Sequence, residues 1–159
     1  MIGLETSGGG ESPWPEGAPD LAADSEVERV CRRVAVAAEF SLSLLKRPEI
    51  PRVRSVVADC LSFGLEPGSE VRDVQLIVGE LVGNAYRHAA HPLALSVVRQ
   101  VRSVLLEVTD DGVDVERVTG RPADAGYGLV LVEQLALDWG ARPVGAGKVV
   151  WALLPLRSP

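Results

Sequence analysis

Aromatic residues and cysteine are both scarce in this sequence. Phe, Trp and Tyr together make up 4% of the 159 residues, so Val, Leu and Ala must fill most of the core of a chain that is 47% hydrophobic. The two cysteines, Cys31 and Cys60, stand among apolar neighbours and form no CxxC pair or Cys/His cluster. We interpret them as buried apolar residues of a reducing cytoplasm, which argues against a zinc site or a disulfide framework.

Long runs of one residue type are missing as well. No stretch of about 18 apolar residues occurs, so no membrane-spanning helix is expected. No long basic run occurs, and 22 acidic against 16 basic residues leave a net charge of −6. This balance argues against binding nucleic acid through a broad basic face. The N-terminus lacks the basic and apolar segments of a signal peptide, so we expect a cytoplasmic protein without a membrane partner.

The length and the local composition predict one domain preceded by a tail. Residues 1–24 are too rich in Gly, Pro and Ser to order themselves and are predicted to be flexible. Residues 25–159 have the size of a single domain.

The periodicity of apolar residues predicts three helices and five strands. Helices are predicted at 51–63, 70–90 and 128–138, and Trp139 and Gly140 are predicted to end the last of them. Strands are predicted in the later half of 34–46 and at 93–98, 104–110, 141–144 and 147–156. A loop is predicted at 111–125. Hairpin-type connections dominate this order. The predicted fold is therefore an α/β (α+β) two-layer sandwich, in which helices cover one face of a mixed but mostly antiparallel sheet.

A polar stripe runs along the predicted helix at 79–89, whose sequence is GELVGNAYRHA. At about 100° per residue, Glu80, Asn84 and Arg87 fall within roughly 60° of one another, apart from the apolar arc of the same helix. A carboxylate, an amide and a guanidinium on one face suit a site for a metal and phosphates. The alternative is an ordinary solvated face.

Two further segments carry candidate binding residues. In VTDDGVD a strand delivers Asp110, which can accept a hydrogen bond from an exocyclic amino group, and Gly112 lets a flat ring approach the backbone. In AGYGLVLVEQL, Gly126 and Gly128 precede a helix whose first N–H groups attract phosphate. An Asp-Gly turn and a flexible loop are the simpler explanations of these two segments.

The order of the three segments resembles the nucleotide-binding boxes of the GHKL (Bergerat-fold) ATPases. The absence of a phosphoacceptor-histidine helix and the ending GYGLVLVEQLALDWG…GKVVWALLP look like the anti-sigma-factor serine kinases and the stand-alone ATP-binding regulators of actinomycetes. The resemblance covers roughly residues 35–156. It implies ATP and Mg²⁺ as cofactors, Glu80 as general base, Asn84 as magnesium ligand, and Asp110 with Gly112 as the adenine site. The other residues that it places near the nucleotide are Arg87, His88, Gly126, Gly128 and Leu129.

Several positions depart from the pattern of the family. Gly83 stands where a hydroxyl residue is common, Tyr86 where a small or aliphatic one is, and Asp114 where a second glycine is usual. Lys148 lies at a recurring basic position whose role the sequence does not assign. His91 is interpreted as a residue at the end of the helix.

The resemblance implies a protein serine/threonine kinase of the anti-sigma type, which uses Mg-ATP to phosphorylate a small partner protein, a sigma factor or an anti-sigma antagonist. The alternative is a non-catalytic regulator, in which ATP orders the loop at 115–125 and thereby gates protein–protein binding. An acetyltransferase is disfavoured, because Ala123 stands where such a loop has Arg or Gln. A homodimer is left open, and no direct contact with nucleic acid is expected.

Overall fold

The computed structural model describes residues 39–62, 69–115 and 126–156. The strands in this part of the chain are β1 (Glu39–Ser43), β2 (Pro92–Arg99), β3 (Ser103–Asp110), β4 (Asp138–Val144) and β5 (Gly147–Pro155), and the helices discussed below are α2 (Ile50–Ser62), α3 (Ser69–His88) and α5 (Gly126–Leu135). The tail predicted at 1–24, Cys31 and the segment 116–125 of the predicted loop lie outside the described residues.

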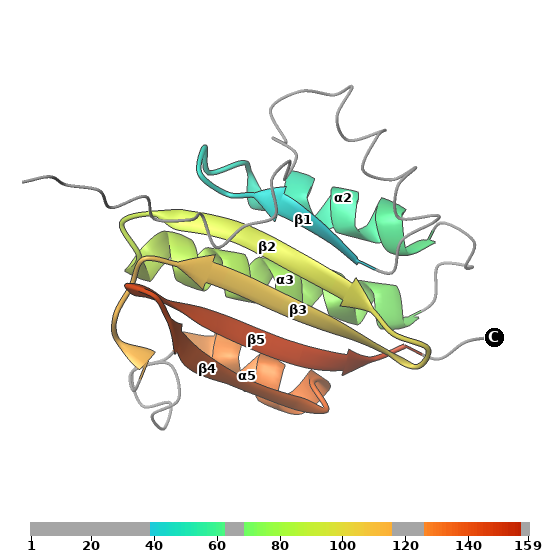
Figure 1. The fold of residues 1–159 in the computed structure, drawn as a ribbon. Helices are drawn as coiled ribbons and strands as arrows, with labels where there is room; N and C mark the ends of the chain where they lie inside the picture. Colours follow the sequence, from blue (N-terminus) through green and yellow to red (C-terminus); the bar gives the residue numbers. More distant parts are fainter. Residues whose placement is uncertain (1–38, 63–68, 116–125, 157–159) are drawn as a thin grey trace, which may run out of the picture.

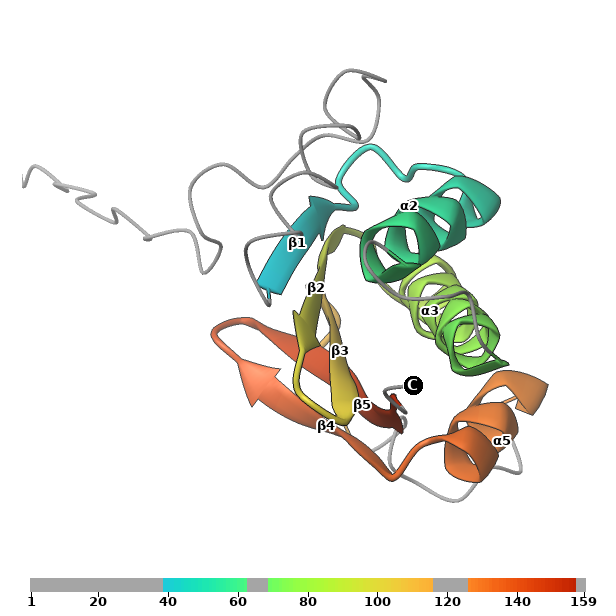
Figure 2. The same ribbon diagram turned by 90° about the vertical axis from the view of Figure 1, so that its right-hand side faces the viewer.

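The strands form one sheet in the order β1-β2-β3-β5-β4, and every neighbouring pair is antiparallel. All three helices lie on one face of this sheet, with α3 between α2 and α5 (Figures 1 and 2). The two-layer sandwich predicted from the sequence is thus confirmed, although no parallel pair occurs among the described strands.

Alternation along the strands places the core between sheet and helices. The inward side chains of the three central strands include Val97, Val104, Leu106, Val150 and Leu154, all of them almost fully buried. Aliphatic side chains supply most of this core, as the scarcity of aromatic residues predicts, and Cys60 is buried within it. None of the described helices is long and apolar enough to cross a membrane.

The prediction for the last helix is wrong at its C-terminal end. Helix α5 ends at Leu135, and Asp138, Trp139 and Gly140 belong to β4, where Gly140 pairs with Trp151 of β5. Gly140 is no helix stop: a Cβ atom there would lie 3.2 Å from the Trp151 ring, so the missing side chain makes room for the indole. Since α5 begins at Gly126, its start also precedes the predicted one.

Candidate functional site

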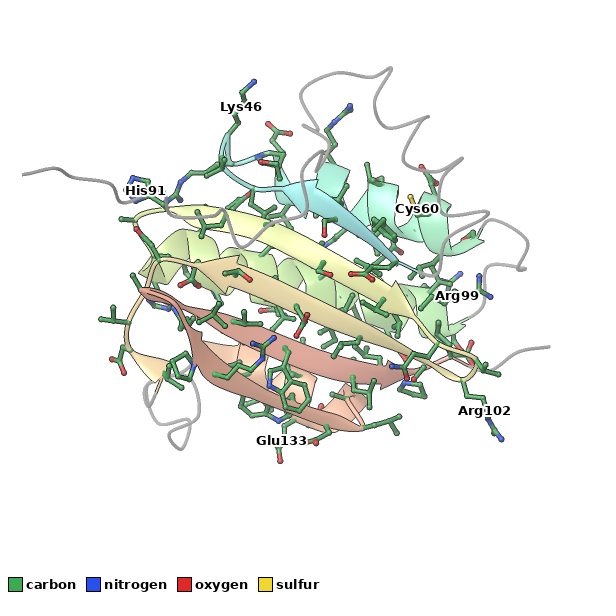
Figure 3. All side chains as sticks on the ribbon, viewed as in Figure 1. Lys46, Cys60, His91, Arg99, Arg102 and Glu133 are labelled. Carbon is green, nitrogen blue, oxygen red and sulfur yellow. The ribbon has the colours of Figure 1, made fainter. Side chains whose placement is uncertain are left out.

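The elements that carry the predicted site residues reach one common end of the sandwich. Strand β3 ends at Asp110, which pairs with Lys148 near the start of β5. The chain that leaves α3 reaches the same end, because the Asp111 N–H donates to the His91 carbonyl over 3.1 Å. Figure 3 shows His91 there, whereas Arg99 and Arg102 lie at the opposite end.

The start of α5 points to this end as well. Two residues after the end of α5, the Leu137 N–H donates to the carbonyl of Leu153, near the far end of β5. The helix therefore runs away from the end that holds Asp110, and Gly126 and Gly128 lie in its first turn. Leu129 is buried and belongs to the core.

Asp110 is the most informative of these residues. Its side chain is 0% exposed, and its Oδ1 accepts hydrogen bonds from Lys148 Nζ over 2.6 Å and from the Gly112 N–H over 2.7 Å. Its Oδ2 is buried and has no partner within the described part of the chain. An unsatisfied buried acceptor costs about 1–3 kcal/mol. A donor on a ligand, such as the exocyclic amino group of adenine, would remove that cost, so the carboxylate fits the predicted role.

Gly112 leaves room for a contact within the protein that the sequence does not predict. A Cβ atom at this position would collide with Lys148 Nζ and lie 2.9 Å from Asp110 Oδ1. The ammonium group therefore occupies the space that a side chain at 112 would need. The sequence offered close approach of a ligand ring as the reason for this glycine, and the structure adds a reason within the protein itself.

The polar and apolar arcs of α3 separate as predicted. The apolar arc, which consists of Val74, Val78, Leu81, Val82, Ala85 and Ala89, is buried. On the polar stripe Glu80 is half-buried, Asn84 is 8% exposed and Arg87 is exposed, and His88 next to the stripe is exposed too. The amide of Asn84 is thus a nearly buried polar group on the face predicted to meet phosphates.

The departures at Gly83 and Tyr86 have local reasons. A Cβ atom at Gly83 would lie 3.3 Å from Arg87 Nη1 and 3.5 Å from Ile50 Cδ1, so this glycine leaves room for the Arg87 side chain and for Ile50 of α2 beside the backbone of α3. The Tyr86 hydroxyl donates to the Pro48 carbonyl over 2.8 Å and ties the end of α3 to the segment before α2. Burial raises the pKa of Tyr86 to about 12, and the positive charge of Arg47 lowers this pKa by a smaller amount.

His91 and Asp111 join the two chain segments beside the site. The Asp111 carboxylate accepts from the His91 N–H over 2.8 Å, and its other oxygen lies 2.6 Å from His91 Nδ1. These contacts, the backbone hydrogen bond first, lower the pKa of Asp111 below its ordinary value. His91 therefore does more than follow the helix, because it fixes the chain after α3 to the end of β3.

A separate cavity of about 370 Å³ lies at the C-terminal end of α5, lined by Glu133, Ala136, Leu137, Asp138, Trp139 and Gly140. Its rim is held by the indole N–H of Trp139, which donates to Glu133 over 2.6 Å. None of the predicted site residues lines this cavity.

Comparison with known protein families identifies the type of domain. Residues 43–154 match the model of the family described as "Histidine kinase-like ATPase domain". No curated protein matches the chain. The matched segment runs from the end of β1 almost to the end of β5 and contains every predicted site residue. Because it covers more than half of the sequence, the chain belongs to the histidine kinase-like ATPase domain family, and its function is to bind ATP.

Proposed function

We propose that this protein is a regulator of the anti-sigma type, a protein serine/threonine kinase that transfers the γ-phosphoryl group of Mg-ATP to a small partner protein. The observation that carries the proposal is the buried Asp110 carboxylate, one oxygen of which has no partner among the described residues. It lies at the end of the sheet where the last turns of α3 and the first turn of α5 also meet.

In this proposal the adenine base is bound by Asp110. Its Oδ2 accepts from the exocyclic amino group, while Gly112 keeps the backbone beside the carboxylate free of a side chain. The phosphates extend towards the first N–H groups of α5, at Gly126 and Gly128. Arg87 lies in the last turn of α3 and adds positive charge there. The imidazole of His88 beside it can donate a hydrogen bond to a phosphate oxygen.

The chemical step is assigned to the polar stripe of α3. Glu80 accepts the proton of the partner's serine or threonine hydroxyl, whose oxygen forms a bond to the γ-phosphorus as the bond to ADP breaks. The half-buried position of Glu80 suits a group that has to meet a second protein. The Asn84 amide oxygen would be the protein's ligand for Mg²⁺, which supplies charge neutralisation to the phosphates.

Calorimetric titration with ADP, with and without Mg²⁺, tests the nucleotide site. Asp110→Asn is expected to weaken binding by about 1.5–3 kcal/mol, because a hydrogen bond to a charged acceptor is lost. Asp59→Asn on the exposed face of α2 makes the same change of charge elsewhere and serves as control. Equal affinity of the Asp110→Asn variant and the wild type would remove the adenine role of Asp110.

Incubation with γ-labelled ATP and candidate partner proteins tests the kinase. Transfer of label to a serine or threonine of the partner supports the proposal. Nucleotide binding without transfer to any partner supports instead the non-catalytic regulator. The exposed Asp114, which stands where the family usually has a glycine, favours this alternative.

A further inference from the structure

Lys148 and Asp110 form a buried ion pair that the proposed mechanism does not yet use in full. Their side chains are 3% and 0% exposed, and Lys148 is the one cationic side chain that is buried in the described part of the chain. Ion pairs of this kind stabilise a fold poorly, because desolvation of both charges offsets their attraction. The pair therefore calls for an explanation other than stability.

The hydrogen bonds of Asp110 are distributed unevenly. Lys148 Nζ and the Gly112 N–H both donate to Oδ1, whereas Oδ2 receives nothing from the described residues. Two donors on one oxygen fix the rotation of the carboxylate and leave the other oxygen for a ligand. The missing side chain at Gly112 is what allows the ammonium group to reach this position.

We propose that Lys148 is the positioning residue that makes the nucleotide site selective for a 6-aminopurine over a 6-oxopurine. This inference rests on the proposed binding of the base at Asp110. A carboxylate removed from water keeps its charge only when a cation or several donors face it. Lys148 is the cation that faces the Asp110 carboxylate. The oxygen Oδ2 of an ionised carboxylate carries no proton and can only accept a hydrogen bond. It accepts from an amino group at position 6 and repels an oxo group there.

Without Lys148 this selectivity is expected to disappear. A carboxyl group that takes up a proton presents both a donor and an acceptor, and it can then pair with either an oxo or an amino group. A purely structural role for Lys148 gives a different result, because loosening the site weakens both kinds of nucleotide by the same factor.

Calorimetric titration of the full chain with ADP and with IDP, which differ in the group at position 6, separates the two roles. The wild type is expected to bind ADP about 10- to 100-fold more tightly, the worth of one hydrogen bond to a charged group. In Lys148→Met the ratio of the two affinities is expected to fall towards one. Arg142→Met, which removes an exposed cation paired with Glu107 on the same sheet, should leave the ratio unchanged.

A second variant keeps the test decisive if Lys148→Met does not fold. Lys148→Gln removes the positive charge but keeps Asp110 and an N–H donor on a long side chain at position 148, so it tests the charge alone. Circular dichroism and a melting curve establish that it is folded. Its ratio of ADP to IDP affinity is also expected to approach one.

The outcomes distinguish the inference from the function on which it rests. A folded variant at Lys148 that keeps the wild-type ratio overturns the role of Lys148, and so does a wild type that binds ADP and IDP equally well. In both cases the nucleotide site itself stands. A wild type that binds neither nucleotide overturns the proposed function together with the inference.

Discussion

The guanidinium group of Arg47 lies 5.3 Å from the centre of the Tyr86 ring and donates a hydrogen bond to the main-chain carbonyl of the same residue over 3.0 Å. It also donates to the carbonyls of Ala89 and Ala90, each over 3.2 Å. These carbonyls lie at the C-terminal end of α3, where helices leave acceptors unpaired and carry partial negative charge. A cation from the segment between β1 and α2 thus caps the helix that carries Asn84.

Replacing Arg47 should destabilise the protein by an amount that depends on the substitute. Arg47 has a φ of 48°, a conformation that costs a residue with a Cβ atom about 1 kcal/mol relative to glycine. Arg47→Ala loses the cap and keeps this strain, so a loss of about 1–2 kcal/mol in the free energy of unfolding is expected. Arg47→Gly loses the same hydrogen bonds but also relieves the strain, since glycine adopts this φ readily, and it should therefore be less destabilised. Urea denaturation measures both, and an Ala variant as stable as the wild type would contradict the capping role.

Elements whose buried residues are regularly spaced can be predicted from the sequence, and elements without such spacing cannot. Helix α3 is 20 residues long and has a continuous buried arc, so its existence and orientation were predictable from spacing. Strand β4 has no such signal: it lies at the edge of the sheet, contains Pro143 and has only exposed and half-buried residues, in no regular order. An edge strand of this kind needs no apolar periodicity, so the sequence predicts that its first three residues belong to the preceding helix or its end.

In the candidate site, too, only residues that are close in the sequence could be recognised together. Asp110 and Gly112 stand two positions apart and could be recognised together as a short motif. The contact of Lys148 with Asp110 spans 38 residues and depends on the register of β3 against β5, which the sequence does not state. Arg47 likewise reaches Tyr86 across 39 residues. Neither partner carries a local signal, so their roles became visible only with the fold.

Tyr86 should titrate with a pKa of about 12, against an ordinary value of 10, because burial disfavours the phenolate. Since the folded-state pKa is the higher one, the stabilising contribution is complete below pH 10 and is lost as pH rises from 10 to about 12. The absorbance of phenolate against pH measures the transition. Tyr86→Phe should remove it and leave only that of the second tyrosine, Tyr127. A wild type in which both tyrosines ionise near pH 10 would refute the burial argument.

Asp111 should titrate below its ordinary pKa of 3.8, mainly through the hydrogen bond from the His91 backbone. Its contribution to stability is therefore present above pH 3.8 and lost as pH falls through the lower folded-state pKa. His91→Ala removes the imidazole and keeps the N–H donor. We expect the pKa of Asp111, followed by carboxyl carbon NMR, to rise in this variant but to remain below 3.8. A full return to the ordinary value would assign the effect to the imidazole instead.

Gly147 is expected to tolerate no side chain. A Cβ atom there would collide with the Asp110 carbonyl oxygen and lie 3.0 Å from the Asp111 Cα atom, which are backbone atoms and cannot turn aside. Gly147→Ala should lower the free energy of unfolding by about 1–3 kcal/mol and weaken nucleotide binding, because it pushes β5, with Lys148, away from Asp110. Gly145→Ala is the matched control: its φ of +53° makes it cost about 1 kcal/mol, but nothing lies within 4 Å of its Cβ position. Equal loss of affinity in the two variants would show that the close approach at Gly147 does not position the site.

Glu80→Gln separates catalysis from binding. The substitution keeps the shape of the side chain and removes its ability to take up a proton, so phosphotransfer to the partner protein should fall about 10²- to 10⁴-fold. Nucleotide affinity should stay near that of the wild type, because adenine is assigned to Asp110 and the metal to Asn84. Glu70→Gln in the first turn of the same helix makes the same change far from the site and should transfer phosphate normally. Unchanged turnover in Glu80→Gln would exclude Glu80 as the base, and a parallel loss of nucleotide binding would place it among the binding residues.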